Sequence, residues 1–165
     1  ELIVLPLATH YKDKIYIQLI GDGSSVTLIK KGIANKGINN IQLIPPVDRS
    51  KLLEYYNNTD MFLLQLNDIP AFKKVLPSKI FDYGSFDKPI LAGVQGVANA
   101  FIKENLPDAF LFDPGDVNSV VKYIDSIIEN GFPLINNEVF IEKYSRNNIM
   151  NDMLNSIVSC HNEKD

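Results

Sequence analysis

The stretch Leu76-Pro77-Ser78-Lys79-Ile80-Phe81-Asp82-Tyr83 predicts a short helix between two buried strands. Its neighbours are two apolar runs, Met61–Leu64 and Pro89–Ala92, which are typical of strands covered on both faces. Pro77 has no N–H to leave unpaired at a helix start, and the Ser78 hydroxyl can cap the free amides of the first turn. This strand–helix–strand order indicates an α/β sheet.

The polar residues of this stretch suggest a binding site. A helix N-terminus carries unpaired N–H groups and the positive end of the helix dipole, so it favours anions such as phosphate. Lys79 adds a full positive charge there, and Asp82 lies one turn beyond Ser78. A carboxylate at that place can accept two hydrogen bonds from a sugar diol. The alternative is a capped surface helix whose Lys79 and Asp82 are merely solvated.

Length and composition describe one ordinary globular domain. The chain has 165 residues, of which 45% are hydrophobic and 22% charged. A net charge of −4 argues against nonspecific electrostatic binding to nucleic acid or acidic lipid, although Lys73, Lys74 and Lys79 form a local basic spot. The single cysteine, Cys160, excludes an internal disulfide and fits a reducing compartment. No run is long enough for a membrane span, and the start at Glu1 suggests a fragment.

Five apolar segments alternate with helical patterns along the chain. The expected strands are Lys14–Ile20, Asn40–Ile44, Asp60–Leu64, Pro89–Ala92 and Ala109–Phe112. None alternates strictly between apolar and polar residues, which favours a doubly wound, mostly parallel α/β sheet with further helices at the C-terminus. Residues 2–5 fit a strand or the start of a helix, and we favour the helix. Ligands of such sheets bind at the carboxyl ends of the strands.

Helix boundaries follow from caps and apolar spacing. Asp48 and Asp116 are expected to cap two helices, Ser24 or Ser25 a third, and Gly37 to end that third helix in a left-handed conformation. Several helical residues are expected to face the core: Val26, Ile29, Ile33, Leu53, Tyr56, Val117, Val120, Val121, Ile124, Ile127 and Ile128. The last helix is expected to bury Ile149, Met153, Leu154, Ile157 and Val158, although part of that stripe would be exposed in a fragment.

The ordered set of motifs resembles the C-terminal half of a retaining glycosyltransferase with the GT-B fold, of family four. Four segments carry the resemblance: Ile17–Gly23 with its Gly-Asp-Gly turn, Ile41–Val47 with the helix and strand that follow, Leu76–Gly84 followed by Lys88–Ala92, and Phe112–Asp116. The third is the most specific. It is similar to a Pro-Ser-Lys-x-x-Glu-Tyr and Lys-Pro signature in members that build bacterial surface polysaccharides.

The resemblance implies roles for individual residues. Pro45, Pro46 and Val47 would hold the nucleobase, and Asp82 would bind the donor ribose. The diphosphate would meet Gly21, Gly23, Ser78 and Lys79. The family's first acidic position falls on Lys74, so half of its acidic pair is missing. The resemblance implies no metal or other cofactor, and it assigns no catalytic residue.

The implied function is that of the donor-binding half of a glycosyltransferase. Residues 1–165 would form a single nucleotide-sugar-binding domain without the N-terminal acceptor domain or the first strand of this half. The full-length enzyme would transfer a hexosyl or N-acetylaminosugar unit from a nucleoside diphosphate sugar to a growing capsule, lipopolysaccharide or lipid-linked acceptor. It would work in the bacterial cytoplasm, with membrane association through the missing half, whereas the isolated domain would be inactive.

Three points stay open at this stage. The sheet would lack its central strand unless residues 2–5 or a neighbouring molecule supplied one. A non-catalytic α/β nucleotide-binding or interaction module is an alternative, but a receiver domain needs clustered acids and only Asp22 ends an early strand. A nucleotide-sugar epimerase of the same two-domain architecture is another. Metal ligation by His10 or His161 and catalysis by Cys160 lack support from residue spacing.

Overall fold

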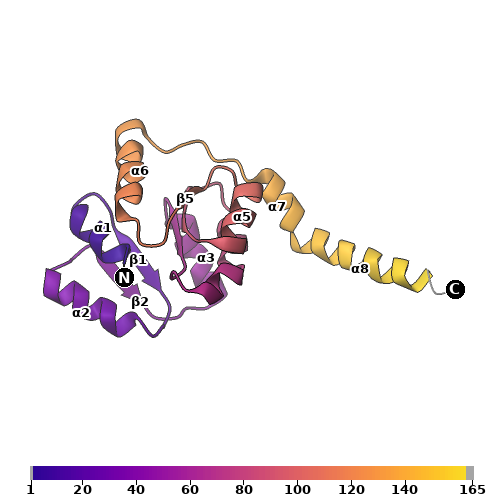
Figure 1. The fold of residues 1–165 in the computed structure, drawn as a ribbon, viewed down its shortest axis with the longest axis horizontal. Coiled ribbons are helices and arrows are strands. Elements are labelled where there is room, and N and C mark those ends of the chain that lie inside the picture. Colours follow the sequence, from indigo (N-terminus) through magenta and orange to yellow (C-terminus); the bar gives the residue numbers. More distant parts are fainter. Residues whose placement is uncertain (1, 163–165) are drawn as a thin grey trace. The chain divides into compact units, whose positions relative to one another are not determined.

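The computed structural model describes residues 2–162, with side chains up to residue 159. Parallel strands and helices alternate along it, which confirms the α/β class (Figure 1). These residues divide into two compact units. The first comprises the chain up to Asp60 together with Phe112–Gly131, and the second comprises Met61–Leu111 with the described residues from Phe132 onward.

The first unit contains a two-stranded parallel sheet and four helices. Its elements are α1 (Val4–His10), β1 (Ile17–Ile20), α2 (Val26–Lys36), β2 (Ile41–Ile44), α3 (Arg49–Asn58) and α6 (Val117–Asn130). β1 pairs with β2 in parallel, with Ile17 opposite Ile41 and Ile20 opposite Ile44. The open question about residues 2–5 is settled in favour of the helix, because α1 begins at Val4.

Two polar residues tie α1 to the rest of the first unit. The Tyr11 hydroxyl lies 2.9 Å from the Val121 carbonyl oxygen and 2.7 Å from Oδ1 of Asp125, both on α6. Nδ2 of Asn40, just before β2, lies within 3.3 Å of the carbonyl oxygens of Ala8, Tyr11 and Ile15. α1 is therefore fixed to both α6 and the sheet.

The caps predicted from acidic residues are confirmed. Asp48 accepts a hydrogen bond from Lys51 N (2.8 Å) at the start of α3, and Asp116 accepts one from Ser119 N (3.1 Å) at the start of α6. Gly37 ends α2 with φ +61°. Ser25 has helical backbone angles and makes no side-chain cap, so the prediction of a serine cap for α2 is wrong.

The second unit contains the other sheet, in the order β3-β4-β5. Its elements are β3 (Phe62–Gln65), the 3₁₀ helix η1 (Pro70–Lys74), α4 (Lys79–Tyr83), β4 (Ile90–Gly93), α5 (Gly96–Asn105), β5 (Phe110–Phe112, whose last residue is grouped with the first unit), α7 (Glu138–Tyr144) and α8 (Arg146–Asn162). β3 and β4 are parallel. The five expected strands therefore exist, but they belong to two sheets.

Burial confirms part of the predicted core. β4 is buried along its whole length, as expected for a central strand, and Val120, Ile124 and Ile127 are buried on α6. Leu53 and Ile128, expected inside, are 40% and 45% exposed. On α2 no residue is fully buried, although Val26, Ile29 and Ile33 are partly covered.

The last helix departs most from expectation. α8 is a long helix that comes directly after α7 (Figure 1). Its apolar side chains are 41–66% exposed. These residues are Ile149, Met150, Met153, Leu154, Ile157 and Val158. The prediction that this stripe is buried core is wrong for the described structure, whereas the alternative of an exposed stripe fits. Within residues 2–162, no helix combines the length and the apolarity that crossing a bilayer requires.

Candidate functional site

The first turn of α4 differs from the predicted anion-binding turn. Ile80 N donates to Pro77 O and Phe81 N donates to Ser78 O, each at 3.1 Å. These i→i+3 bonds occupy two amides that the sequence predicts as free for a phosphate. With five residues, α4 also has few peptide dipoles to sum. Most of the attraction for an anion here must therefore come from the charge of Lys79.

Ser78 does not cap α4 through its side chain. Its backbone is helical, with φ −60° and ψ −25°, and its hydroxyl makes no capping hydrogen bond. A capping serine needs an extended backbone to direct its oxygen at the first-turn amides. The predicted serine cap is therefore wrong, although Ser78 does stand at the exposed start of the helix.

Lys79 and Asp82 pair with each other. Nζ of Lys79 lies 3.2 Å from Oδ2 of Asp82, and the two side chains are 46% and 28% exposed. A solvent-exposed pair of this kind stabilises a protein by at most about 1 kcal/mol. Both groups can therefore exchange this contact for a ligand at little energetic cost.

The opposite side of α4 is packed into the second unit. Ile80 is 1% exposed, and the Phe81 ring contacts the rings of Phe101 (5.6 Å between centroids) and Tyr144 (5.3 Å). A Cβ atom added at Gly84 would overlap the ring of Phe140. The short helix is thus fixed by its apolar face, which leaves Lys79 and Asp82 accessible.

A second group of predicted residues gathers at the carboxyl end of β1 and β2. Gly21 N donates to Ile44 O at 2.9 Å, so the Gly21 turn lies beside Pro45. Gly21 has φ +135°, which residues with a side chain rarely adopt, and a Cβ atom at Gly21 or Gly23 would meet nothing within 4 Å. Pro45 and Pro46 are exposed and Val47 is half-buried. This edge offers open backbone, as binding through backbone groups requires.

The structure thus brings the predicted residues together in two groups. Gly21, Gly23 and Pro45–Val47 belong to the first unit, and Ser78, Lys79 and Asp82 belong to the second. That both groups share one edge of a single ligand site stays a prediction.

The loop before α4 contains a feature that the sequence reading missed. η1 occupies Pro70–Lys74, and Lys73 pairs with Asp68 at 3.4 Å. A Cβ atom at Gly96 would overlap the Lys73 carbonyl oxygen, and Gly96 has φ +63°. The loop is thus fixed against the start of α5. Pro70, a favourable first residue of a helix, was the available signal. Lys74, at the family's first acidic position, is exposed at the end of η1.

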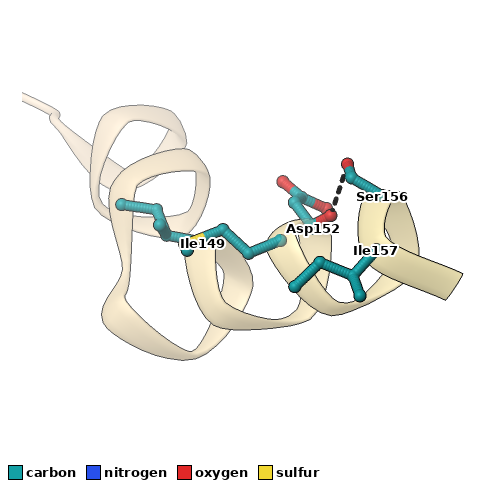
Figure 2. Close-up of a pocket in the computed structure, with 5 residues that line it drawn as sticks. Ile149, Asp152, Ser156 and Ile157 are labelled. Atoms are coloured by element: carbon teal, nitrogen blue, oxygen red, sulfur yellow. Dashed lines mark hydrogen bonds between the residues drawn. The ribbon is translucent and has the colours of Figure 1, made fainter. Parts of the chain in front are cut away.

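A shallow surface hollow in the described part of the chain contains none of these residues. Figure 2 shows it on α8, lined by Ile149, Asp152, Met153, Ser156 and Ile157. The Ser156 hydroxyl donates to the Asp152 carbonyl oxygen at 2.8 Å. Because all five residues come from one helix, the hollow is a feature of the exposed α8 face and does not define a ligand site.

A comparison with known families decides the assignment. The family model described as "Glycosyl transferases group 1" matches residues 4–148, which is most of the chain. The chain belongs to this glycosyltransferase family. No curated protein and no solved structure matches the chain significantly.

The group 1 assignment confirms the resemblance found in the motifs, and the fold is compatible with one Rossmann-like half of a GT-B enzyme. The match includes α4 and both groups of predicted site residues. In the part of this glycosyltransferase that the structure describes, no cluster of three or more His, Cys, Asp or Glu side chains could hold a metal ion. The His10 ring packs edge-on against Tyr11 (4.5 Å between centroids), and the side chain of Cys160 lies outside the described residues.

Proposed function

We propose that this chain is the nucleotide-sugar-binding part of a glycosyltransferase, in which Asp82 binds the donor ribose and Lys79 the diphosphate. The observation that carries the proposal is the exposed Lys79–Asp82 pair on α4, within a region that matches the group 1 family. A cation and a carboxylate 3.2 Å apart offer one group for phosphate oxygens and one for hydroxyl donors.

The chemical role of such a site is to stabilise the leaving group. Transfer of the sugar leaves a nucleoside diphosphate, on which negative charge increases as the glycosidic bond breaks. A Lys79 ammonium group beside the diphosphate would interact with that charge, so it would contribute more in the transition state than in the ground state. Asp82 would hold the ribose and so keep the diphosphate in register with Lys79.

Further parts of the proposal concern the whole enzyme. Gly21, Gly23 and Ser78 would add contacts to the diphosphate, and Pro45–Val47 would receive the nucleobase through backbone groups. The transferred unit would be a hexose or N-acetylaminosugar, and the acceptor a bacterial surface polysaccharide or a lipid-linked precursor. The enzyme would act in the cytoplasm without a metal, together with an N-terminal acceptor domain.

Calorimetric titration with UDP and GDP tests the ribose assignment. Asp82→Ala should lower the affinity for the preferred diphosphate by about 1–3 kcal/mol, the scale for a lost charge-assisted hydrogen bond. Asp108→Ala is the matched control, because Asp108 is an exposed carboxylate on the α5–β5 turn of the same unit. Equal affinities of the wild-type and Asp82→Ala proteins would refute the assignment, as would no binding of either nucleotide by the wild-type protein.

A further inference from the structure

Asn137, just before α7, is a buried polar residue that the proposed site does not use. Its side chain is 4% exposed, and its Nδ2 atom donates to Phe86 O at 2.7 Å. Its backbone N–H donates to Oδ1 of Asp87 at 2.8 Å. Both partners lie about fifty positions earlier in the chain, so these bonds fix the start of α7 to the segment around Phe86.

That segment continues directly from α4. Ser85 N donates to Asp82 O at 3.3 Å, and Phe86 N donates to Tyr83 O at 3.1 Å. Phe86, whose carbonyl oxygen Asn137 holds, is therefore hydrogen-bonded to Tyr83 in the last turn of α4. A displacement of Phe86 would move the backbone of Asp82.

α7 supports α4 by packing as well. The Phe140 ring contacts Phe81 on α4 (6.2 Å between centroids) and leaves no room for a side chain at Gly84. At the other end of α7, the Tyr144 hydroxyl and Lys143 Nζ approach Oδ1 of Asn105 on α5, at 2.9 and 2.8 Å. α7 is thus anchored at both ends while its aromatic face presses on α4.

α4 needs such support because it is short. A helix of five residues has little stability of its own in water, so its conformation depends on tertiary contacts. We infer that Asn137 is a positioning residue of the donor site: its two hydrogen bonds fix the turn after α4 and thereby the position of the Asp82 carboxylate. This inference rests on the proposed function, because it assumes that Asp82 binds the ligand.

Asn136 supplies a matched control for the test. Its Oδ1 atom accepts a hydrogen bond from Glu138 N at 2.9 Å, at the same start of α7, and the side chain is exposed. Asn136→Ala and Asn137→Ala each remove a hydrogen bond at this helix start, but only Asn137 reaches the turn after α4. Asn137→Asp is a second variant, which keeps the size and the backbone N–H but loses the Nδ2 donor.

The experiment combines calorimetric titration with UDP and GDP and amide hydrogen exchange of residues 80–86 without ligand. Asn137→Ala and Asn137→Asp should bind about tenfold more weakly than the wild-type protein, and Asn136→Ala within about twofold of it. Exchange of the α4 amides should be faster in both Asn137 variants and unchanged in Asn136→Ala.

Other outcomes of these measurements distinguish a failure of the positioning role of Asn137 from a failure of the proposed function. If Asp82→Ala weakens binding but the Asn137 variants bind like the wild-type protein, the positioning role is overturned and the proposed function stands. If Asp82→Ala binds like the wild-type protein, the proposed function fails and the inference fails with it. If both Asn137 variants do not fold while Asn136→Ala does, Asn137 serves the fold alone, which also overturns the inference.

Discussion

The Nζ atom of Lys79 lies 3.2 Å from Oδ2 of Asp82, three residues further along α4. This pair joins the two residues that the sequence assigns to different parts of one donor molecule. A ligand that engages both must replace the contact between them, and because the pair is exposed, that replacement costs little. The pair therefore keeps both side chains near one position before a ligand arrives.

Lys79→Gln should separate phosphate binding from nucleoside binding. We expect the affinity for UDP or GDP to fall by roughly 1 kcal/mol, because a partly exposed cation is lost from beside the phosphates, while the affinity for the corresponding nucleoside stays unchanged. Calorimetric titration measures both. Lys103→Gln, which changes an exposed lysine on α5 of the same unit, is the control, and an equal loss in that variant would contradict a specific role for Lys79.

Phe140→Ala should destabilise the second unit. Phe140 is 3% exposed and contacts Phe81, Phe101 and Tyr144, so its truncation leaves a cavity among three aromatic rings. The expected loss is roughly 3–5 kcal/mol in urea denaturation. Val139→Ala, at a position 80% exposed on the same helix, should change the stability little. Similar losses in the two variants would show that the aromatic cluster is not tightly packed.

Gly96→Ala should also destabilise the protein. The added Cβ atom would overlap the Lys73 carbonyl oxygen, and φ at this residue is +63°. Since the neighbour is backbone, it cannot rotate away, and we expect a loss of roughly 1–3 kcal/mol together with faster amide exchange in η1. Gly23→Ala, where nothing lies within 4 Å and φ is not left-handed, is the control. A neutral Gly96→Ala variant would mean that η1 is not held against α5.

Tyr11 should make the stability depend on alkaline pH. Burial, with the hydrogen-bonded Asp125 carboxylate beside it, raises the pKa of the Tyr11 phenol above its ordinary value of 10.0. The folded protein therefore holds this proton more tightly than the unfolded chain. The resulting stability is complete below pH 10.0 and decreases as the pH rises towards the folded-state pKa.

Comparison with Tyr11→Phe isolates this effect. At neutral pH the variant should be less stable by about 1 kcal/mol, because the hydroxyl hydrogen bonds to α6 are lost. The difference in unfolding free energy between the two proteins, measured by urea denaturation, should shrink as the pH rises above the pKa of the free phenol. Tyr16→Phe, at a position 61% exposed, should show no such trend. The pH range from 8 to 11 covers about three units around the pKa of the free phenol. A stability difference that stays constant over this range would contradict the assignment.

Local signals in the sequence predict the elements well and their assembly less well. Aspartate caps succeed at Asp48 and Asp116, because a carboxylate reaches the first-turn amides wherever the backbone before the helix is not helical. The same reasoning fails at Ser25 and Ser78, where the backbone is already helical. The division of the strands into two sheets depends on which strands find a neighbour, and apolar patterns alone do not contain that information.

The candidate donor site was likewise predicted in its local elements but not in its long-range contacts. The motif around Pro77 correctly predicts a short helix with Lys79 and Asp82 accessible on it. The support from Asn137 was not predicted, because it comes from a residue more than fifty positions away whose role depends on the fold. The predicted burial of the α8 stripe is wrong because helical periodicity identifies an apolar face but not whether anything covers it.

Asn40 makes the position of α1 depend on a single amide group. Its Nδ2 atom serves three carbonyl oxygens, and its buried Oδ1 atom has no partner among the described residues. Deamidation would replace the one group that donates there by a carboxylate, which would face three acceptors with no proton to share. Loss of this one amide nitrogen would therefore release α1 from the start of β2, although the apolar packing around it stays unchanged.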